Sequence, residues 1–189
     1  MKTLVFFAAI LLSTVASRAA EEATPEVVAK RQIEAMRSLN WELVARYTHP
    51  RALEQMQALF IPVVIAGAAA TENPAAQEMM KIVFAGKSAD ELSGMAPTAF
   101  FQVVMKGISG ATPDFKSAMT GMEIQILGSV KEGENLTHVV YRLSRTIGDN
   151  VATKIATTTV ERDGEMWKAQ LNSDLENVAR AISARLQRP

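Results

Sequence analysis

The feature that most constrains the fold is a change of hydrophobic period at Met122. Before this residue, apolar side chains recur at helical spacing; after it, they alternate with polar ones, as in half-buried strands. Ile124 and Ile126 belong to the first alternating set, and Trp167 and Ala169 belong to the last. Runs of helix followed by runs of strand are typical of an α+β fold.

Helix start signals divide the part before Met122 into several helices. Thr24-Pro25-Glu26 combines a cap residue, a proline suited to the first turn and an acid near the positive helix end. Asn40 predicts the cap of a short second helix. A third helix follows His49-Pro50, and we expect Pro62 to kink or end it. Residues 88–91 predict a capping box before a further helix.

Turn residues separate the strands that follow. We predict turns at 131–135, 148–150 and 163–164, where Gly accompanies Glu, Asp or Asn. The segments between them are rich in Thr, Val and Ile, as strands are. The sequence therefore predicts a four-stranded antiparallel meander and a closing helix capped by Ser173-Asp174. With the preceding helices, these elements predict one α+β domain over residues 20–189.

Residues 1–19 have the order of a secretory signal peptide. Lys2 precedes the uncharged run Thr3–Ala16, and small residues lead to Ala19. The apolar part is shorter than the ~20 residues that span a bilayer, and no cysteine follows for a lipid anchor. We expect cleavage after Ala19 and export to the periplasm or the medium, without a stable membrane anchor. The second apolar run, Phe60–Ala70, predicts a buried helix end or a flexible flap.

Composition excludes several kinds of function. The chain has no cysteine, which rules out disulfides, thiolate nucleophiles and Cys-ligated metals. Its 20 basic and 20 acidic residues balance, and without a Lys/Arg run the chain lacks the footprint of a nucleic-acid binder. Gly86-Lys87-Ser88 is not preceded by the first glycine of a phosphate loop, so we expect no cofactor. The spacing of acids and of the histidines His49 and His138 predicts no metal site and no catalytic residue.

Arg145 is the polar residue that breaks its local pattern. It shares strand parity with Tyr141, Leu143 and Ile147, so a regular strand would direct it toward the apolar face. A buried guanidinium needs acceptors there. Arg145 could pair with a core acid, line a polar pocket mouth or escape through a bulge. Our functional hypothesis is that Arg145 and the Tyr141 hydroxyl mark the polar end of an otherwise apolar ligand-binding pocket.

Two segments resemble the nuclear-transport-factor-2-like superfamily. Asn40-Trp41-Glu42-Leu43 followed by His49-Pro50-Arg51-Ala52-Leu53 is similar to exported bacterial members of unknown function, and Gly164-Glu-Met-Trp167-Lys168 resembles the family's last strand. The resemblance implies a cone, in which a bent antiparallel sheet wraps around helices, often with a pocket between them. The family includes isomerases, dehydratases, polyketide cyclases and noncatalytic modules. The helical stretch 51–121 is a longer insertion than is usual, and no catalytic set of the family matches, so no catalytic residue is carried over.

These observations favour an exported, noncatalytic domain that binds a small apolar molecule or a protein partner. The 10 methionines fit this expectation, because methionine fills irregular cores and lines adaptable binding surfaces. A pocket enzyme of the isomerase or dehydratase type is one alternative, and a structural module that forms a homodimer through its sheet is another. We also predict that Trp167 packs in the core against the first helix, near Ile33 or Met36.

Overall fold

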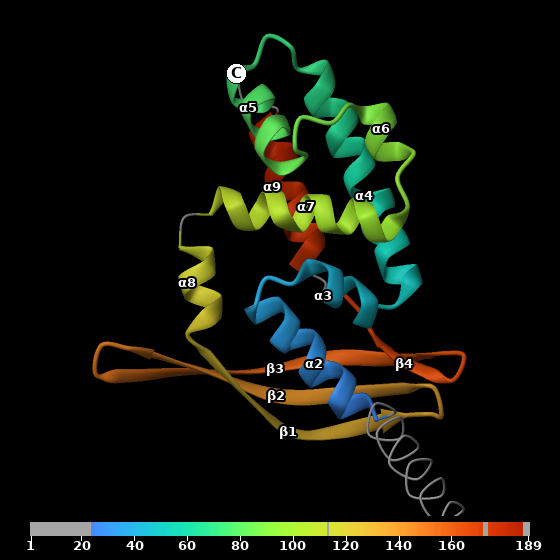
Figure 1. The fold of residues 1–189 in the computed structure, drawn as a ribbon, viewed down its shortest axis with the longest axis vertical. Helices are drawn as coiled ribbons and strands as arrows, with labels where there is room; N and C mark the ends of the chain where they lie inside the picture. The colour runs from blue at the N-terminus through green and yellow to red at the C-terminus, as the bar shows by residue number, and fades with distance from the viewer. Residues whose placement is uncertain (1–23, 113, 172–173, 187–189) are drawn as a thin grey trace, which may run out of the picture.

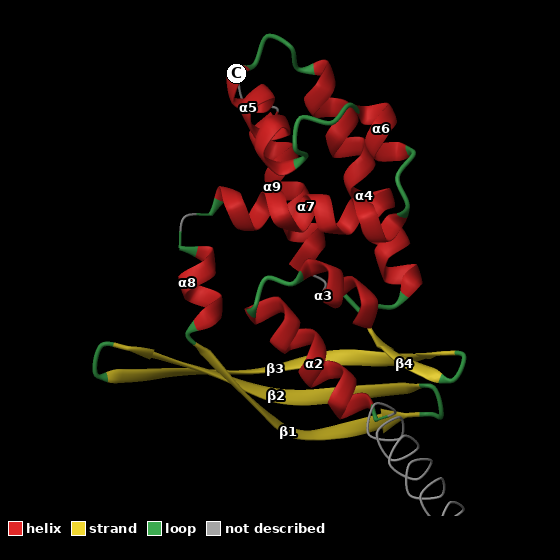
Figure 2. Cartoon of the chain, viewed as in Figure 1, coloured by secondary structure: helices red, strands yellow, loops and turns green. Residues whose placement is uncertain are grey.

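The computed structural model describes residues 24–112, 114–171 and 174–186. Its fold is α+β, as predicted: a group of helices, then a four-stranded antiparallel sheet, then a C-terminal helix (Figures 1 and 2). The helices before the sheet are α2 (Pro25–Arg37), α3 (Trp41–Tyr47), α4 (Pro50–Ala69), α5 (Pro74–Val83), α6 (Ala89–Ser93), α7 (Pro97–Ala111) and α8 (Phe115–Thr120). The strands and the last helix are β1 (Met122–Glu132), β2 (Leu136–Ile147), β3 (Asn150–Asp163), β4 (Met166–Ala169) and α9 (Asp174–Leu186).

The sheet is an open meander in the order β1-β2-β3-β4. Its register places Ile126 opposite Tyr141, and Tyr141 opposite Ala156. A bulge between Ile126 and Gly128 shifts the β1–β2 register by one residue, which is a common device on edge strands. Helix α2 packs on one face of all four strands (Figure 1). We call this the inner face of the sheet and the opposite one the outer face.

The predicted helix caps at Thr24, Asn40 and Ser88 are confirmed, whereas Ser173 of the predicted Ser173-Asp174 cap lies outside the described residues. The Thr24 hydroxyl accepts a hydrogen bond from the Val27 amide at 3.4 Å, and Asn40 Oδ1 accepts one from the Leu43 amide at 3.0 Å. Ser88 and Glu91 form both halves of a capping box. These caps satisfy amides that have no partner within the helix. No cap was predicted from the sequence before helix α8, and its cap residue Asp114 makes no side-chain hydrogen bond to the helix backbone.

Pro62 does not end its helix, because α4 continues to Ala69. Pro62 lacks the amide that would bond to the Ala58 carbonyl. Both residues are exposed, so water can take the place of that bond. The side chains of Phe60, Val63 and Val64, on the other side of the helix, are buried and hold it against its neighbours.

The apolar half of α4 is therefore part of a packed core. Within the described residues, α4 is the helix that is long and apolar enough to cross a membrane by length and composition alone. Seven of its residues are buried against other helices, which is typical of a core helix of a folded domain. Of the two expectations for Phe60–Ala70, a helix end packed in the core describes the structure better than a flap.

Buried apolar side chains form two cores. The helical core joins α2–α7 and α9 and includes Trp41, whose ring centroid lies 6.5 Å from that of Phe101. The sheet core lies between α2 and the inner face; its buried members are Val28, Ala29, Val139, Val160, Trp167 and Ala169.

Trp167 lies in the core, as predicted, with 8% of its surface exposed. Trp167 shares the sheet core with Val28 and Ala29 of α2, whereas Met36 packs against the helical core. Ile33, the other predicted neighbour, is buried but belongs to neither core. The short strand β4 lies toward the start of α2. Strand parity predicts which face of the sheet Trp167 occupies, but it does not predict which turn of the helix lies opposite.

Candidate functional site

A cavity that is open to solvent lies among helices α5, α7 and α9. Its volume is about 660 Å³. Most of its lining is apolar, from Ala75, Met79, Ile82 and Val83 of α5, Ile108 and Ala111 of α7, and Val178 and Ile182 of α9. The resemblance implied a pocket between sheet and helices, and this cavity instead lies wholly within the helical layer.

A close crossing of α5 and α7 forms one wall of the cavity. A Cβ atom added at Gly107 would lie 2.1 Å from the Val83 carbonyl oxygen, so the two backbones touch there. Gln77 fixes the start of α5 against the end of α4, because its Nε2 donates to the Gly67 and Ala70 carbonyls at 3.3 and 3.1 Å. The wall is thus set by a backbone contact and by two hydrogen bonds of the exposed Gln77 side chain, in addition to side-chain packing.

Three polar side chains reach the lining: Asn73, Glu78 and Thr112. Asn73 Oδ1 accepts a hydrogen bond from the Ala76 amide at 3.0 Å and so caps α5. The Thr112 hydroxyl donates to the Ile108 carbonyl at 3.1 Å and closes the end of α7. Glu78 is exposed, and no hydrogen bond or ion pair joins it to another residue within the described ranges.

Tyr141 and Arg145, the predicted ligand-binding residues, lie on the inner face of β2. Four residues along a strand correspond to about 13 Å, and half-buried Leu143 lies between the two. Burial raises the pKa of the Tyr141 phenol. Arg145 is half-buried beside the end of α8, where a Cβ at Gly121 would lie 3.8 Å from its Nε. Neither residue lines the cavity among α5, α7 and α9, and their role in ligand binding stays a prediction.

The structure gives His138 partners that the sequence spacing did not suggest. Its Nε2 lies 2.7 Å from a Glu132 carboxylate oxygen, and its Nδ1 lies 3.1 Å from the Thr159 hydroxyl. The β1–β2 hairpin and the β2–β3 register bring these three residues together on the outer face. His49 makes a local hydrogen bond, in which its Nδ1 accepts from the Arg51 amide at the start of α4.

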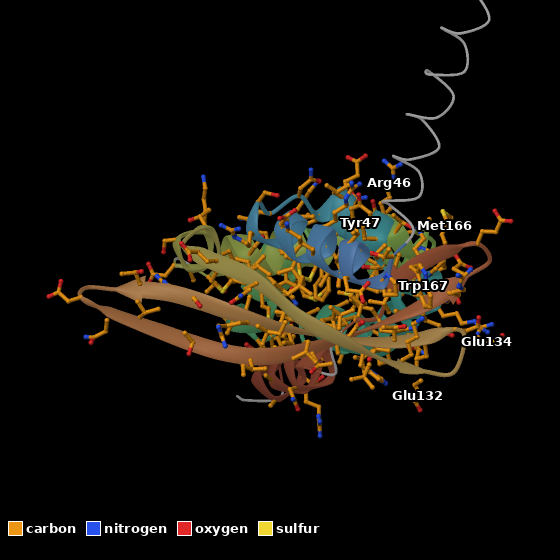
Figure 3. All side chains as sticks on the ribbon, turned by 90° about the horizontal axis from the view of Figure 1, so that it is seen from below. Arg46, Tyr47, Glu132, Glu134, Met166 and Trp167 are labelled. Atoms are coloured by element: carbon orange, nitrogen blue, oxygen red, sulfur yellow. The ribbon has the colours of Figure 1, made fainter. Side chains whose placement is uncertain are left out.

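A smaller cavity of about 280 Å³ lies between the end of α3, the starts of α4 and α7, and strand β4. Its lining includes Arg46, Glu54, Asp163 and Lys168, but Lys168 Nζ is bound to the Arg46 carbonyl oxygen at 2.7 Å. Figure 3 labels Arg46, Tyr47, Met166 and Trp167 toward one end of the sheet, and Tyr47 packs against the sheet core that contains Trp167. The volume is below the ~300 Å³ at which small-molecule sites usually begin.

Metal binding has no support in the part of the chain that the structure describes, since no group of three or more His, Asp or Glu side chains converges there.

The outer face of the sheet carries several exposed apolar residues. Val130, Val151 and Ile155 are each more than 60% exposed and all face outward by register. They are separated by polar residues such as Arg142, so they form a spaced line rather than a continuous patch.

No protein-family model, no curated protein and no solved structure matches the chain. The resemblance to the nuclear-transport-factor-2-like superfamily therefore stays a prediction from the residues quoted for it. Among the features of the described residues, the cavity between α5, α7 and α9 comes nearest to a small-molecule site in volume and lining.

Proposed function

We propose that the protein is an exported, noncatalytic domain that binds a small apolar molecule between α5, α7 and α9. The observation that carries the proposal is the cavity of about 660 Å³ with its apolar lining. This volume falls within the ~300–1,000 Å³ typical of small-molecule sites, which are mostly apolar with a few polar groups. Ile82 supports the proposal as well, because it is 42% exposed and a ligand would remove apolar surface from water.

The lining favours binding over catalysis. An isomerase or dehydratase needs an acid and a base placed on the same substrate, with environments that separate their pKa values. Among the described lining residues, Glu78 is the only ionisable group. Asn73 and Thr112 already bond to helix-end backbone groups, so the cavity offers shape and apolar surface more than proton transfer.

Native mass spectrometry of the protein purified from its own host tests this proposal. We expect a bound species of small mass in the wild type. Ala111→Trp, which adds a large side chain to the lining, should lose that mass, whereas Ala68→Trp on the exposed side of α4 should keep it. Retention of the mass by both variants would place the ligand outside this cavity and contradict the proposal.

Self-association through the outer face of the sheet is a second candidate function, favoured by exposed Val130, Val151 and Ile155. The same spectra report it, because they give the oligomeric state together with any bound mass. A dimer that Ile155→Lys dissociates would favour this candidate. A monomer across the concentration range of the experiment would exclude it.

Export rests on residues 1–19, which lie outside the described residues. The proposal gives a mature protein that begins at Ala20, within a few residues. N-terminal sequencing of protein from the extracytoplasmic fraction checks this, and a soluble cytoplasmic protein with Met1 intact would contradict it.

A further inference from the structure

We infer that the molecule bound among α5, α7 and α9 is a single-chain amphiphile with a cationic head group, which Glu78 holds at the rim of the cavity. The inference rests on the proposed function and adds the chemistry of the ligand's polar end. It follows from which polar groups of the lining are already engaged and which remain available.

Two of the three polar side chains are committed to the protein's own backbone. Asn73 Oδ1 accepts the Ala76 amide at 3.0 Å, and the Thr112 hydroxyl donates to the Ile108 carbonyl at 3.1 Å. Removing either bond would leave a helix-end group unsatisfied. A ligand therefore gains little from these two residues, and the third decides the polarity of the site.

Glu78 is the available group. It is exposed, and within the described ranges neither a hydrogen bond nor an ion pair engages it. An exposed carboxylate carries a negative charge at neutral pH. The one basic residue of α5, Lys81, is not part of the lining. The charge that the cavity offers from its described residues is thus negative, which favours a cation and opposes a fatty-acid-like anion.

The position of Glu78 suits an amphiphile. Glu78 and Ile82 lie four residues apart on α5 and both belong to the lining, so they lie on one helix face with Cβ atoms about 6 Å apart. A head group at Glu78 would place the first part of an alkyl chain on Ile82. Ile108 and Val178 would then contact the chain from the two neighbouring helices.

Three probes with the same ten-carbon chain test the inference: decylammonium and decanoate, each below its micelle-forming concentration, and decanol below its solubility limit. Isothermal titration calorimetry would measure the affinities. We expect decylammonium to bind about fivefold more tightly than decanol, the gain from one charge pair at contact distance in a water-like medium. Decanoate should bind more weakly than decanol, and added salt should reduce both differences.

Glu78→Gln should make the affinities for decylammonium and decanol equal and leave that for decanol unchanged. Glu42→Gln, which removes an exposed acid on α3 away from the cavity, should keep the wild-type order. Equal binding of all three probes by the wild type, tighter binding of decanoate, or a preference that survives Glu78→Gln would overturn the inference while leaving an apolar ligand site in place. Failure of every probe to bind, or equal binding by Ala111→Trp, would instead contradict the proposed function itself.

Discussion

Trp167 and Met166 are neighbours on β4 and lie in opposite surroundings. The Trp167 side chain enters the sheet core beside α2, with the Arg162 guanidinium carbon 4.8 Å from its ring centroid. Met166 points the other way and is 58% exposed, because successive strand residues face opposite sides of a sheet. Substitutions at these two neighbouring residues therefore show how burial, at nearly the same position in the chain, changes the free energy of unfolding.

Trp167→Ala should lower the free energy of unfolding by about 3–5 kcal/mol, the range for deleting a large aromatic side chain from a core. Met166→Ala should change it by no more than about 0.5 kcal/mol, as is usual at exposed sites. Urea denaturation followed by circular dichroism measures both. A loss below about 1 kcal/mol for Trp167→Ala would contradict the buried position.

Two glycines of α7 show how one helix is tied to another. Gly107 is the point of contact with α5, where any side chain would meet the Val83 backbone. Gly110, less than one turn later, has nothing within 4 Å of a Cβ built on it. Both are helical, so they share the same intrinsic cost relative to alanine and differ in what lies beside them.

Gly107→Ala should destabilise the protein, because a Cβ placed 2.1 Å from the Val83 oxygen forces α5 and α7 apart and reshapes the cavity between them. Gly110→Ala should stabilise it by up to about 1 kcal/mol, the helix propensity difference between the two residues. Thermal or urea unfolding shows whether each variant is more or less stable than the wild type. A stabilising Gly107→Ala would mean that the helices do not cross this closely.

Elements with local signals could be predicted from the sequence, and contacts between distant elements could not. The caps at Thr24, Asn40 and Ser88 are short-range hydrogen bonds, so residue type and spacing were sufficient. Whether Pro62 would end α4 depended on the solvent exposure of its side of the helix, which the local sequence does not give. The cavity depends on three helices far apart in the sequence, and no pattern within one helix predicts what packs beside it.

The molecule as a whole is built on two cores that share α2. Ala35 of α2 belongs to the helical core, and Val28 and Ala29 belong to the sheet core. Two further hydrogen bonds hold the junction of α3 and α4 in place: the His49 amide donates to the Ala169 carbonyl of β4 at 2.9 Å, and the buried Gln32 Nε2 of α2 donates to the Thr48 hydroxyl at 2.9 Å. Loss of either core would expose α2 and these bonds, so we expect the two cores to unfold together.

The two tryptophans of the chain test this expectation, because Trp41 lies in the helical core and Trp167 in the sheet core. Trp41→Phe leaves a fluorescence reporter for the sheet core, and Trp167→Phe leaves one for the helical core. In each variant, the urea midpoint from fluorescence should coincide with the midpoint from far-ultraviolet circular dichroism, as in a two-state transition. The comparison is made within one variant, so any stability lost through the substitution shifts both midpoints equally. Fluorescence that changes at a lower urea concentration than the circular dichroism in one variant, and at a higher one in the other, would show that the helical layer and the sheet fold as separate units.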